Sequence, residues 1–341
     1  MFVARKPSMD DVAAAAGVSR ITVDRVLNGR GGVKPKTEQL VIETARALGV
    51  DRALTMMPTR ILRIGVVLQN NVNSYYVKLR EGFIRSAQQY KRYNIRITFW
   101  YFEQIKAEAA IKTLAKAAAE CDGLVVILFD DPDVTAMVDQ LSRKLPIVTV
   151  ASDLPGTGRI GYVGSNAVQE GRTAGALMGR FLGDTGGDVV VIVGLYQLLE
   201  HDQREMGFRD ILGRDYPNCR VVETFQSYEQ ENIRKDFRTL LRRHAALRGV
   251  YNMSVGNPVL AEELKAIGKD QSVCVITHTV TPERVELMDD GVVDAIIDRE
   301  PFLEARRAIE IQLHNAGRFA EDDITPPQRP RIFLRENVRF E

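Results

Sequence analysis

Residues 8–29 read SMDDVAAAAGVSRITVDRVLNG and predict two short helices joined by a tight turn. Ser8 followed by aspartates is the pattern of a helix start, because a serine oxygen can cap backbone N–H groups and acidic side chains favour the first turn. Gly17 suits the left-handed residue that ends such a helix, and Ser19 can cap the next one. A third helix is expected to begin at Pro35. Together these segments predict a small all-α helix-turn-helix head.

The second predicted helix has one apolar face and one polar face. Its apolar stripe would turn Arg20, Ile21 and Arg25 outward. A major groove admits such a helix, in which an arginine can pair with guanine and an isoleucine can pack on a thymine methyl. Further groups suited to phosphate come from Ser19, Thr22, Asn28, Lys34, Lys36 and Thr37. The segment therefore indicates either a DNA-binding face or the solvated charged face of a small helical subdomain.

The first 60 residues are more basic than the rest of the chain. They contain ten Lys and Arg against six Asp and Glu, whereas the remainder contains 36 against 39, so the net charges are +4 and −3. A basic segment on a mildly acidic body indicates that this segment meets a polyanion. The asymmetry is modest and gains its weight from the helix-turn-helix pattern.

Composition places the chain among ordinary globular proteins. Hydrophobic residues make up 45% of the 341 residues and charged residues 27%. No run approaches the roughly 18 apolar residues of a membrane-spanning helix, and the first 25 residues lack the apolar segment of a secretory signal. Three widely spaced cysteines fit neither a disulfide framework nor a zinc site. These features predict a cytoplasmic protein with no membrane partner.

The head resembles the DNA-binding segment of a known family. Residues 11–29 are similar to D-V-A-x-x-A-G-V-S-x-x-T-V-S-R-V-L-N, the opening of the lactose-repressor/galactose-repressor (LacI/GalR) family. Residues 33–37 are similar to its V-S-x-x-T-R segment. The resemblance implies binding to double-stranded operator DNA, with bases read by positions 20, 21 and 25. It also implies backbone contacts from Ser19, Asn28 and Thr37.

Asp24 departs from this pattern, because the family usually has serine there. A carboxylate at this position could repel phosphate, accept a hydrogen bond from cytosine N4, or contact Arg20 or Arg25. The operator sequence therefore does not follow from the resemblance.

Residues 50–62 are predicted to join the head, residues 1–49, to the body. In the family a hinge helix here folds on the operator and places a leucine in the minor groove. This chain lacks the family's Pro-Asn and its Ala-Arg-x-Leu spacing, and Leu54 is the nearest candidate for that leucine. Both a hinge helix and a plain linker are consistent with the segment.

The body, residues 63–341, is predicted to be α/β, with two doubly wound lobes. Apolar runs alternate with amphipathic stretches about every 30 residues, which is typical of this fold. The N-lobe is expected at about 63–162 and 296–318, and the C-lobe at about 163–295 and 319–341. Helices are predicted at 75–90, 108–120, 167–182, 198–212, 230–244, 258–267 and 302–314.

The body also resembles the periplasmic-binding-protein-like core of the same family, near the ribose-type sugar-binding proteins. Residues 73–76 are similar to N-P-F-F, and residues 151–155 to D-S-D-x-P. Residues 162–166 are similar to Y-V-G-T-D, and residues 204–208 to R-x-x-G-F. The resemblance implies a ligand cleft between the lobes. In open α/β sheets a ligand sits beyond the carboxyl ends of the strands.

Sugar chemistry suggests which side chains would line that cleft. Hydroxyls favour planar partners such as Asp, Asn and Arg, and the C–H face of a sugar favours an aromatic ring. Residues of these kinds lie near predicted strand ends or within the family motifs. The candidates for effector binding are Asn73, Tyr75, Tyr76, Asp131, Asp153, Asn166, Arg204, Asn252, Asn257, His278 and Arg299.

Several of these candidates also have a structural interpretation. Tyr76 could belong to the core, Asp153 could cap a turn, and Asn166 could cap a helix. His278 could be buried against a backbone partner. Arg204 has the weakest structural interpretation, because a buried arginine needs an acceptor to justify its position.

Four positions depart from the family's usual ligand-binding residues. Ala151 stands where the first Asp of D-S-D is usual, and Gly256 replaces the Asn of an Asn-Asp pair. His278 stands where an aromatic residue is common, and Arg299 where glutamine is. These departures favour an acidic or otherwise unusual sugar derivative.

The predicted function is a ligand-responsive, sequence-specific DNA-binding regulator. It would be a repressor of genes for the catabolism or uptake of carbohydrates or polyols. It would bind a palindromic operator as a homodimer or a tetramer and respond to a sugar, polyol or sugar acid. Walker, H-E-x-x-H and G-x-S-x-G motifs are absent, so no catalytic residue, cofactor or metal is expected. The alternatives are a solute-binding protein of a sugar transporter and a sugar-acting α/β enzyme.

Overall fold

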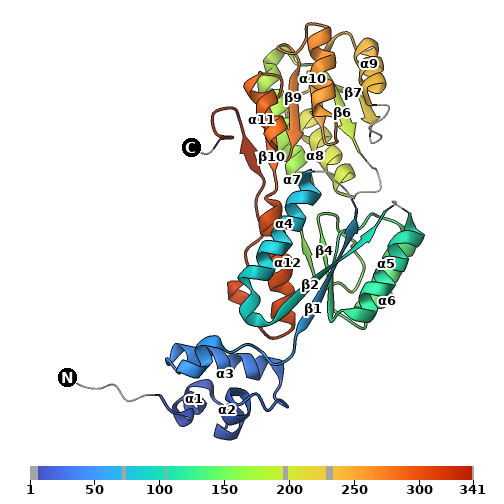
Figure 1. Cartoon of the computed structure of the whole chain (residues 1–341). Coiled ribbons are helices and arrows are strands. Elements are labelled where there is room, and N and C mark those ends of the chain that lie inside the picture. Colours follow the sequence, from blue (N-terminus) through green and yellow to red (C-terminus); the bar gives the residue numbers. More distant parts are fainter. Residues whose placement is uncertain (1–6, 71–73, 104–105, 195–198, 228–232, 340–341) are drawn as a thin grey trace, which may run out of the picture.

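The computed structural model describes residues 7–70, 74–103, 106–194, 199–227 and 233–339. A small helical head stands at one end of the molecule, and two larger lobes follow it along the long axis (Figure 1). This arrangement confirms the predicted fold class of a helical head and two α/β lobes.

The head consists of three helices: α1 (Met9–Ala16), α2 (Arg20–Leu27) and α3 (Pro35–Ala47). The predicted start of α1 is confirmed, because Ser8 Oγ accepts a hydrogen bond from the Asp11 N–H at 3.3 Å and the Asp11 carboxylate accepts one from the Ser8 N–H at 2.7 Å. Gly17 ends α1 in the left-handed region, with φ of 64°. An aliphatic core that includes Val12 and Val23 holds the helices together.

The joint between head and body contains a short 3₁₀ helix, η1 (Asp51–Thr55). Ala53 is fully buried and Met56 partly buried against the core of the head, so the packing of the head extends past residue 49. The segment is therefore more ordered than a plain linker and shorter than a hinge α-helix. The side chain of Leu54 lies outside the described part of the structure.

The N-lobe is built on a parallel five-stranded sheet in the order β2-β1-β3-β4-β5. Its strands are β1 (Leu62–Gln69), β2 (Ile95–Phe102), β3 (Gly123–Val126), β4 (Ile147–Val150) and β5 (Gly161–Val163). One face is covered by α4 (Ser74–Gln89) and α12 (Pro301–Asn315), and the other by α5 (Ala107–Glu120) and α6 (Pro132–Ser142).

The C-lobe is built on a six-stranded sheet in the order β11-β10-β9-β8-β6-β7, with only β11 antiparallel. Its strands are β6 (Gly187–Val193), β7 (Cys219–Gln226), β8 (Leu247–Asn252), β9 (Cys274–His278), β10 (Ala295–Asp298) and β11 (Arg331–Phe333). One face is covered by α7 (Ala167–Leu182) and α8 (Leu199–Asp215). The other is covered by α9 (Ile233–Arg243), α10 (Asn257–Ala266) and α11 (Pro282–Asp289). The remaining short 3₁₀ helices are η2 (Lys91–Tyr93), η3 (Gly183–Thr185) and η4 (Glu321–Asp323).

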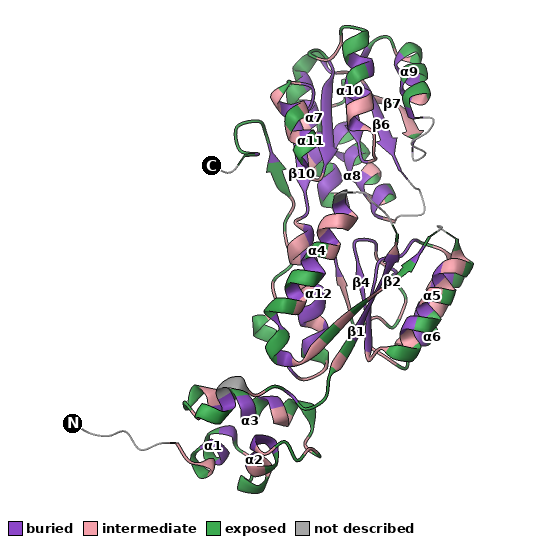
Figure 2. Cartoon of the chain, viewed as in Figure 1, coloured by how far each residue is buried: buried purple, intermediate pink, exposed green. Residues whose placement is uncertain are grey.

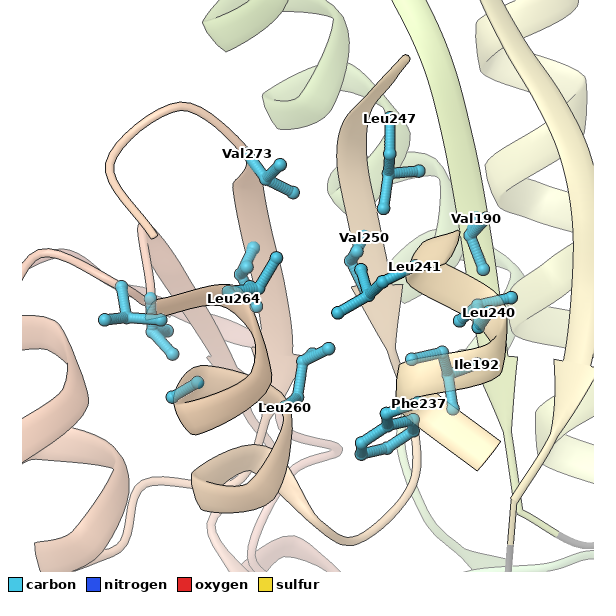
Figure 3. Close-up of a cluster of buried hydrophobic side chains, with 14 of the residues drawn as sticks. Val190, Ile192, Phe237, Leu240, Leu241, Leu247, Val250, Leu260, Leu264 and Val273 are labelled. Carbon is cyan, nitrogen blue, oxygen red and sulfur yellow. The ribbon is translucent and has the colours of Figure 1, made fainter. Parts of the chain in front are cut away.

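Inner strands such as β3 and β4 are buried throughout because helices cover both faces of each sheet, whereas the edge strands β2 and β7 are only partly buried. All four residues of β3 are buried, and Figure 2 shows the sheets as the buried layer of both lobes. In the C-lobe, Val190 and Ile192 of β6 and Val250 of β8 pack against Phe237 and Leu240 of α9 (Figure 3). Full burial of one such side chain contributes roughly 1.5–3 kcal/mol relative to exposure.

The chain returns to the N-lobe between β10 and α12. β10 pairs with β9 in the C-lobe sheet, whereas α12 packs against α4 in the N-lobe. The crossover therefore lies at residues 299–300, a few residues later than the predicted position near 296. After α12 the chain crosses again, and β11 pairs with β10.

All seven predicted helices of the body are present, with ends shifted by at most three residues. The sequence pattern does not predict α6 and α11, which are 11 and eight residues long. Each begins with proline after a capping residue, Asp131 or Thr281. The buried side chains of α11 are Arg284 and Met288, so an apolar stripe does not mark this helix. Such short helices depend on packing against the sheet.

Candidate functional site

A cavity lies between the two lobes, beyond the carboxyl ends of their strands. Its volume is about 980 Å³, including the part that is open to solvent. The N-lobe contributes Tyr75 and Tyr76 from the start of α4 and Ser152 from the turn after β4. The C-lobe contributes Arg204 of α8 and His278 at the end of β9. This is the position at which doubly wound lobes hold ligands.

Five of the eleven predicted effector residues line this cavity: Tyr75, Tyr76, Arg204, His278 and Arg299. They come from the N-lobe, the C-lobe and the crossover between them. A ligand that touched all five would therefore hold the lobes together. Their contact with an effector stays a prediction.

Three other predicted effector residues are used within their own loops and do not line the cavity. Asp131 and Asn166 are the N-caps of α6 and α7, where they accept hydrogen bonds from backbone N–H groups. Asp153 forms an ion pair with Arg159 at 2.5 and 2.6 Å and accepts a hydrogen bond from Thr149 at 2.9 Å. None of the three lines the cavity, and each acceptor bonds to a local donor; their contact with an effector stays a prediction.

Asn252 and Asn257 also do not line the cavity. Both are buried, and Asn252 Nδ2 donates to Asn257 Oδ1 at 3.0 Å. Asn252 Oδ1 accepts from the Ser254 N–H at 2.9 Å, so the pair fixes the turn between β8 and α10. The remaining candidate, Asn73, lies outside the described residues.

Arg204 and Arg299 share one carboxylate in a buried network. Arg204 Nε lies 2.6 Å from Glu170 Oε2, and its Nη2 lies 3.4 Å from Glu200 Oε2. Arg299 also donates to Glu200. Although burial alone would raise the pKa of Glu200, the charges of Arg299 and Arg204 lower it to about 2. Arg204 therefore has the acceptors that its structural interpretation requires.

Tyr75 connects this network to α12. The Arg299 guanidinium lies 4.2 Å from the centroid of the Tyr75 ring, and the Tyr75 hydroxyl donates to Glu304 Oε2 at 2.5 Å. Burial raises the pKa of Glu304 to about 7, and Arg299 offsets only part of this effect. Because an arginine covers one face of the Tyr75 ring, the half-buried Tyr76 is the better candidate for stacking on a sugar.

Three ionisable residues of the cavity wall are not among the residues predicted from the sequence: Glu200, His201 and Arg284. Glu200 and His201 open α8, which follows β6, so the rule that ligands sit past strand ends could have identified them. Arg284 lies on α11, a helix without an apolar stripe, and the sequence offers no comparable signal for it.

The turns that line the cavity contain two residues with left-handed backbone. Ala151 after β4 has φ of 66°, and Thr279 after β9 has φ of 65°. This conformation costs a non-glycine residue roughly 1–2 kcal/mol. Such strain clusters at functional sites, which supports the cavity as the binding site.

Three buried polar atoms of the cavity wall have no hydrogen-bond partner within the described residues: Ser152 Oγ, His278 Nδ1 and Arg284 Nε. Burial lowers the pKa of His278, and Arg204 and Arg299 lower it further, so its ring is neutral. Buried polar groups in proteins are nearly always paired. The cavity wall is thus complementary to a polar ligand.

The outer face of α2 is exposed, as the sequence predicts. Arg20, Ile21 and Arg25 are all exposed, and Ile21 retains 72% of its accessible surface. Arg25 Nε donates to the Gly31 carbonyl at 3.1 Å, which directs the guanidinium along the turn that follows α2. An apolar side chain flanked by two arginines fits a groove that offers thymine methyls and guanine acceptors.

Asp24 is paired inside the head. Its carboxylate accepts from Asn28 Nδ2 at 2.7 Å and from Arg30 Nη1 at 2.6 Å. The predicted alternative of a contact with Arg20 or Arg25 is wrong, because Arg20 lies 3.5 Å from an aspartate of α1 and Arg25 bonds to a carbonyl. Pairing with Arg30 reduces the repulsion that this carboxylate would exert on phosphate.

Several predicted phosphate-contacting groups have partners within the head. Ser19 Oγ accepts from the Thr22 N–H at 3.2 Å and lies 2.9 Å from Thr22 Oγ1. Asn28 Oδ1 accepts from an arginine of η1 at 2.8 Å. Lys34 is exposed and Thr37 is half-buried at the start of α3. These residues lie around α2, but their contact with DNA stays a prediction.

Arg318, just past α12, ties the joint to the N-lobe. Its guanidinium is buried and donates to the carbonyls of Arg60 and Tyr93, each at 2.7 Å. Asn94 Nδ2 donates to the Pro58 carbonyl at 2.8 Å. Because α12 begins at the cavity and ends beside these contacts, it runs from the cavity to the joint.

Within the described part of the chain, none of the helices has the length and apolar character needed to cross a membrane. The same residues contain no group of three or more His, Cys, Asp or Glu side chains placed to hold a metal ion.

Comparison with known proteins identifies both parts of the chain. Residues 8–49 match the family described as bacterial regulatory proteins, lacI family, and residues 64–316 match the periplasmic binding protein domain. Catabolite control protein A of Priestia megaterium is 33% identical over 156 residues, which cover 44% of this chain and 45% of that protein. The regulator GalS of Salmonella typhimurium is 31% identical over 136 residues, which cover 38% and 39%. The chain thus matches less than half the length of these relatives.

Solved structures share the fold of the body. A glucose-galactose binding protein, GanP from Geobacillus stearothermophilus, superposes with a TM-score of 0.74 at 18% identity, over 82% of this chain and 100% of that one. A sugar-binding protein of an ABC transporter from Bacillus halodurans gives a TM-score of 0.70 at 19% identity, over 81% and 98%. At this identity the likeness establishes the fold alone.

Proposed function

Because this chain belongs to the family with a periplasmic binding protein domain and its residues 8–49 match the lacI family of bacterial regulatory proteins, we propose that it is a transcriptional regulator whose affinity for operator DNA responds to a small polar ligand. The operator would be a palindromic duplex bound by a homodimer, since half-sites mirror the two-fold symmetry of the protein. The ligand would be a sugar, a polyol or a sugar acid, and the chain would act as a repressor rather than as an enzyme.

The observation that carries this proposal is the presence in one chain of an exposed recognition helix and a cavity between two lobes that is lined by charged side chains. α2 presents Arg20, Ile21 and Arg25 to solvent, while Arg204 and Arg299 lie in the cavity between the lobes. A solute-binding protein of a transporter, which the body resembles in fold, needs no basic head. The head therefore favours the regulator over the solute-binding protein.

The path between ligand and DNA would follow α12. Arg299 and Glu304, at one end of this helix, belong to the network around the cavity. Arg318, past the other end, holds the carbonyl of Arg60 in the joint. If a ligand closes the lobes, it displaces one end of this helix relative to the C-lobe. Ligand and operator affinities would then be coupled by the same factor in both directions.

The test combines operator selection with a ligand screen. The full chain is used to select sequences from a random duplex library, and binding to the selected duplex is measured by fluorescence anisotropy. Sugars, polyols and sugar acids are screened in parallel by thermal shift, where ligand at 100 times its Kd adds about 2.7 kcal/mol to stability. We expect at least one ligand that raises the melting temperature to change operator affinity.

If the chain binds a ligand but its head does not prefer the selected sequence over random duplex, the result would contradict the proposal of a regulator. It would support a solute-binding protein instead. Turnover of the bound ligand would support an enzyme. Sedimentation of the complex with the selected duplex measures how many chains bind each duplex, which tests the dimer. A homodimer also predicts that the selected sequence contains two half-sites spaced by about one helical turn or a multiple of it.

A further inference from the structure

We propose that the effector carries an anionic group, a carboxylate or a phosphate, which pairs with Arg284 in the wall of the cavity. This inference rests on the proposed function, because it names the chemistry of the ligand that the cavity would hold.

Arg284 differs from the other arginines of the cavity in its partners. Arg204 pairs with Glu170 and Glu200, and Arg299 pairs with Glu200. Arg284 retains only 9% of its accessible surface, yet among the described residues no carboxylate lies within ion-pair distance of its nitrogens. Among the described residues, Arg284 is therefore a buried cation without an ion-pair partner.

The surroundings of Arg284 do not compensate this charge. Its Nη1 donates to the Thr279 carbonyl at 2.9 Å, while its buried Nε has no hydrogen-bond partner among the described residues. Burial lowers the pKa of Arg284, and the more distant Glu283 and Asp298 offset only part of this effect. Arginine nevertheless stays protonated in proteins, so the site keeps its positive charge. A buried charge without its partner is strongly destabilising, and an anion in the cavity would relieve that cost.

Ser152 and His278 line the same cavity, and each has a buried polar atom without a partner among the described residues that could donate to an anion there. Ser152 Oγ can donate one hydrogen bond. His278 Nε2 lies 2.7 Å from the Tyr251 hydroxyl, and when that hydroxyl donates to Nε2, His278 Nδ1 carries the ring proton and can donate as well. Carboxylates and phosphates offer several strong acceptor oxygens, which suits a guanidinium assisted by neutral donors.

The first experiment needs no identified ligand. The full chain is compared with its Arg284→Met variant, which replaces the guanidinium by an apolar side chain of similar length. Removing an unpaired buried charge should raise the melting temperature in chloride buffer. The control is Arg180→Met, which removes an exposed arginine of α7 outside the cavity wall and should leave the melting temperature nearly unchanged.

Inorganic phosphate then serves as the probe of the anion site. At matched ionic strength, replacing chloride by phosphate should raise the melting temperature of the wild type and of Arg180→Met by more than that of Arg284→Met. The difference between variants is the readout, because phosphate stabilises folded proteins in general by exclusion from their surface.

The second experiment identifies the anion. Hexoses and pentoses are tested as matched sets of the neutral sugar, the sugar acid and the phosphate ester, with Kd measured by calorimetry. We expect one anionic member of a set to bind more tightly than its neutral counterpart. Arg284→Met should weaken that binding by about 10- to 150-fold, as expected for a lost charged hydrogen bond. Arg284→Lys should restore part of it, because the charge returns without the planar fork.

Two results would overturn the anion site. In the first, Arg284→Met melts below Arg180→Met, and phosphate raises the melting temperature equally in all variants. This result would make Arg284 a structural residue. The second is equal affinity for the neutral, acidic and phosphorylated members of a set that binds. A neutral effector that still changes operator affinity would leave the proposed function standing, whereas ligand binding that never affects DNA binding would count against that function instead.

Discussion

Arg204 is predicted to stabilise the C-lobe because it neutralises a buried carboxylate. Its Nε lies 2.6 Å from Glu170 Oε2, the side chain of Arg204 is 3% exposed, and that of Glu170 is fully buried. In an Arg204→Met variant, Glu170 keeps a hydrogen bond from the Ser165 hydroxyl but, among the described residues, loses its cationic partner. Glu200 keeps its ion pair with Arg299. The variant therefore buries one uncompensated negative charge.

The magnitude follows from measurements on comparable buried pairs. Removing one partner costs about 3–5 kcal/mol. For a lobe of this size, 1 kcal/mol shifts the melting temperature by about 2–4 °C, so the expected decrease is about 6–20 °C. Differential scanning calorimetry of the full chain measures this shift and separates the lobes if they melt independently. The matched control is Arg209→Met on the same helix, because the Arg209 side chain is 44% exposed and a pair with such a solvent-exposed arginine is worth about 1 kcal/mol.

A double variant, Glu170→Gln with Arg204→Met, isolates the charge. It removes both charges and leaves an amide that can bond to Ser165, so it should melt above Arg204→Met alone. The reasoning is refuted if Arg204→Met melts within about 2 °C of the Arg209→Met control, or if the double variant melts as low as the single one. Ligand affinity of Arg204→Met is interpretable only at temperatures where the variant is folded.

Three further predictions follow from the same structure. Burial raises the pKa of Glu304 from 4.5 to about 7, so the carboxyl group stays protonated to a higher pH in the folded state than in the unfolded state. Its contribution to stability is present below pH 4.5 and should decline by about 3 kcal/mol as the pH rises through 7; Glu304→Gln should lack this part of the pH profile of unfolding, and identical profiles would contradict the assignment. Arg25→Ala should weaken binding to the selected operator by about 1–3 kcal/mol and relax its sequence preference, with the fold unchanged by circular dichroism; unaltered affinity and preference would remove Arg25 from the reading face. A fragment of residues 58–341 should melt cooperatively and bind ligand, whereas residues 61–341 should melt lower because Arg318 loses the Arg60 carbonyl; aggregation of both would show that head and body fold as one unit.

The head illustrates how much local chemistry can specify. The bonds that begin α1 join Ser8 and Asp11, three residues apart, and Gly17 supplies the left-handed turn that ends it. The exposed face of α2 follows from helical spacing, because Val23 and Leu27 are buried on its opposite side. Interactions this close in sequence can be predicted from one segment, so the three helices of the head follow from the sequence, whereas the partners of Asp24 do not.

The strands of the body were predictable for a similar reason. Apolar runs such as β3 require helices on both faces, whatever the order of the strands. The short helices α6 and α11 were not predicted, because their few buried side chains gain a partner only from the sheet beneath them. The motifs also lie at strand ends, and Tyr75, Arg204 and Arg299, which are predicted from them, line one cavity.

The tertiary structure alone decided which polar groups remain for a ligand. Asp153 had the right chemistry and position, but Arg159 occupies its carboxylate. Glu200 and Arg299 are 99 residues apart in sequence, and only the crossover between β10 and α12 brings them together. No pattern in the sequence identifies Arg284. The residue matters because its side chain is buried and no carboxylate among the described residues pairs with it. Whether a charge is satisfied depends on every element packed around it, and a sequence read segment by segment does not contain that information.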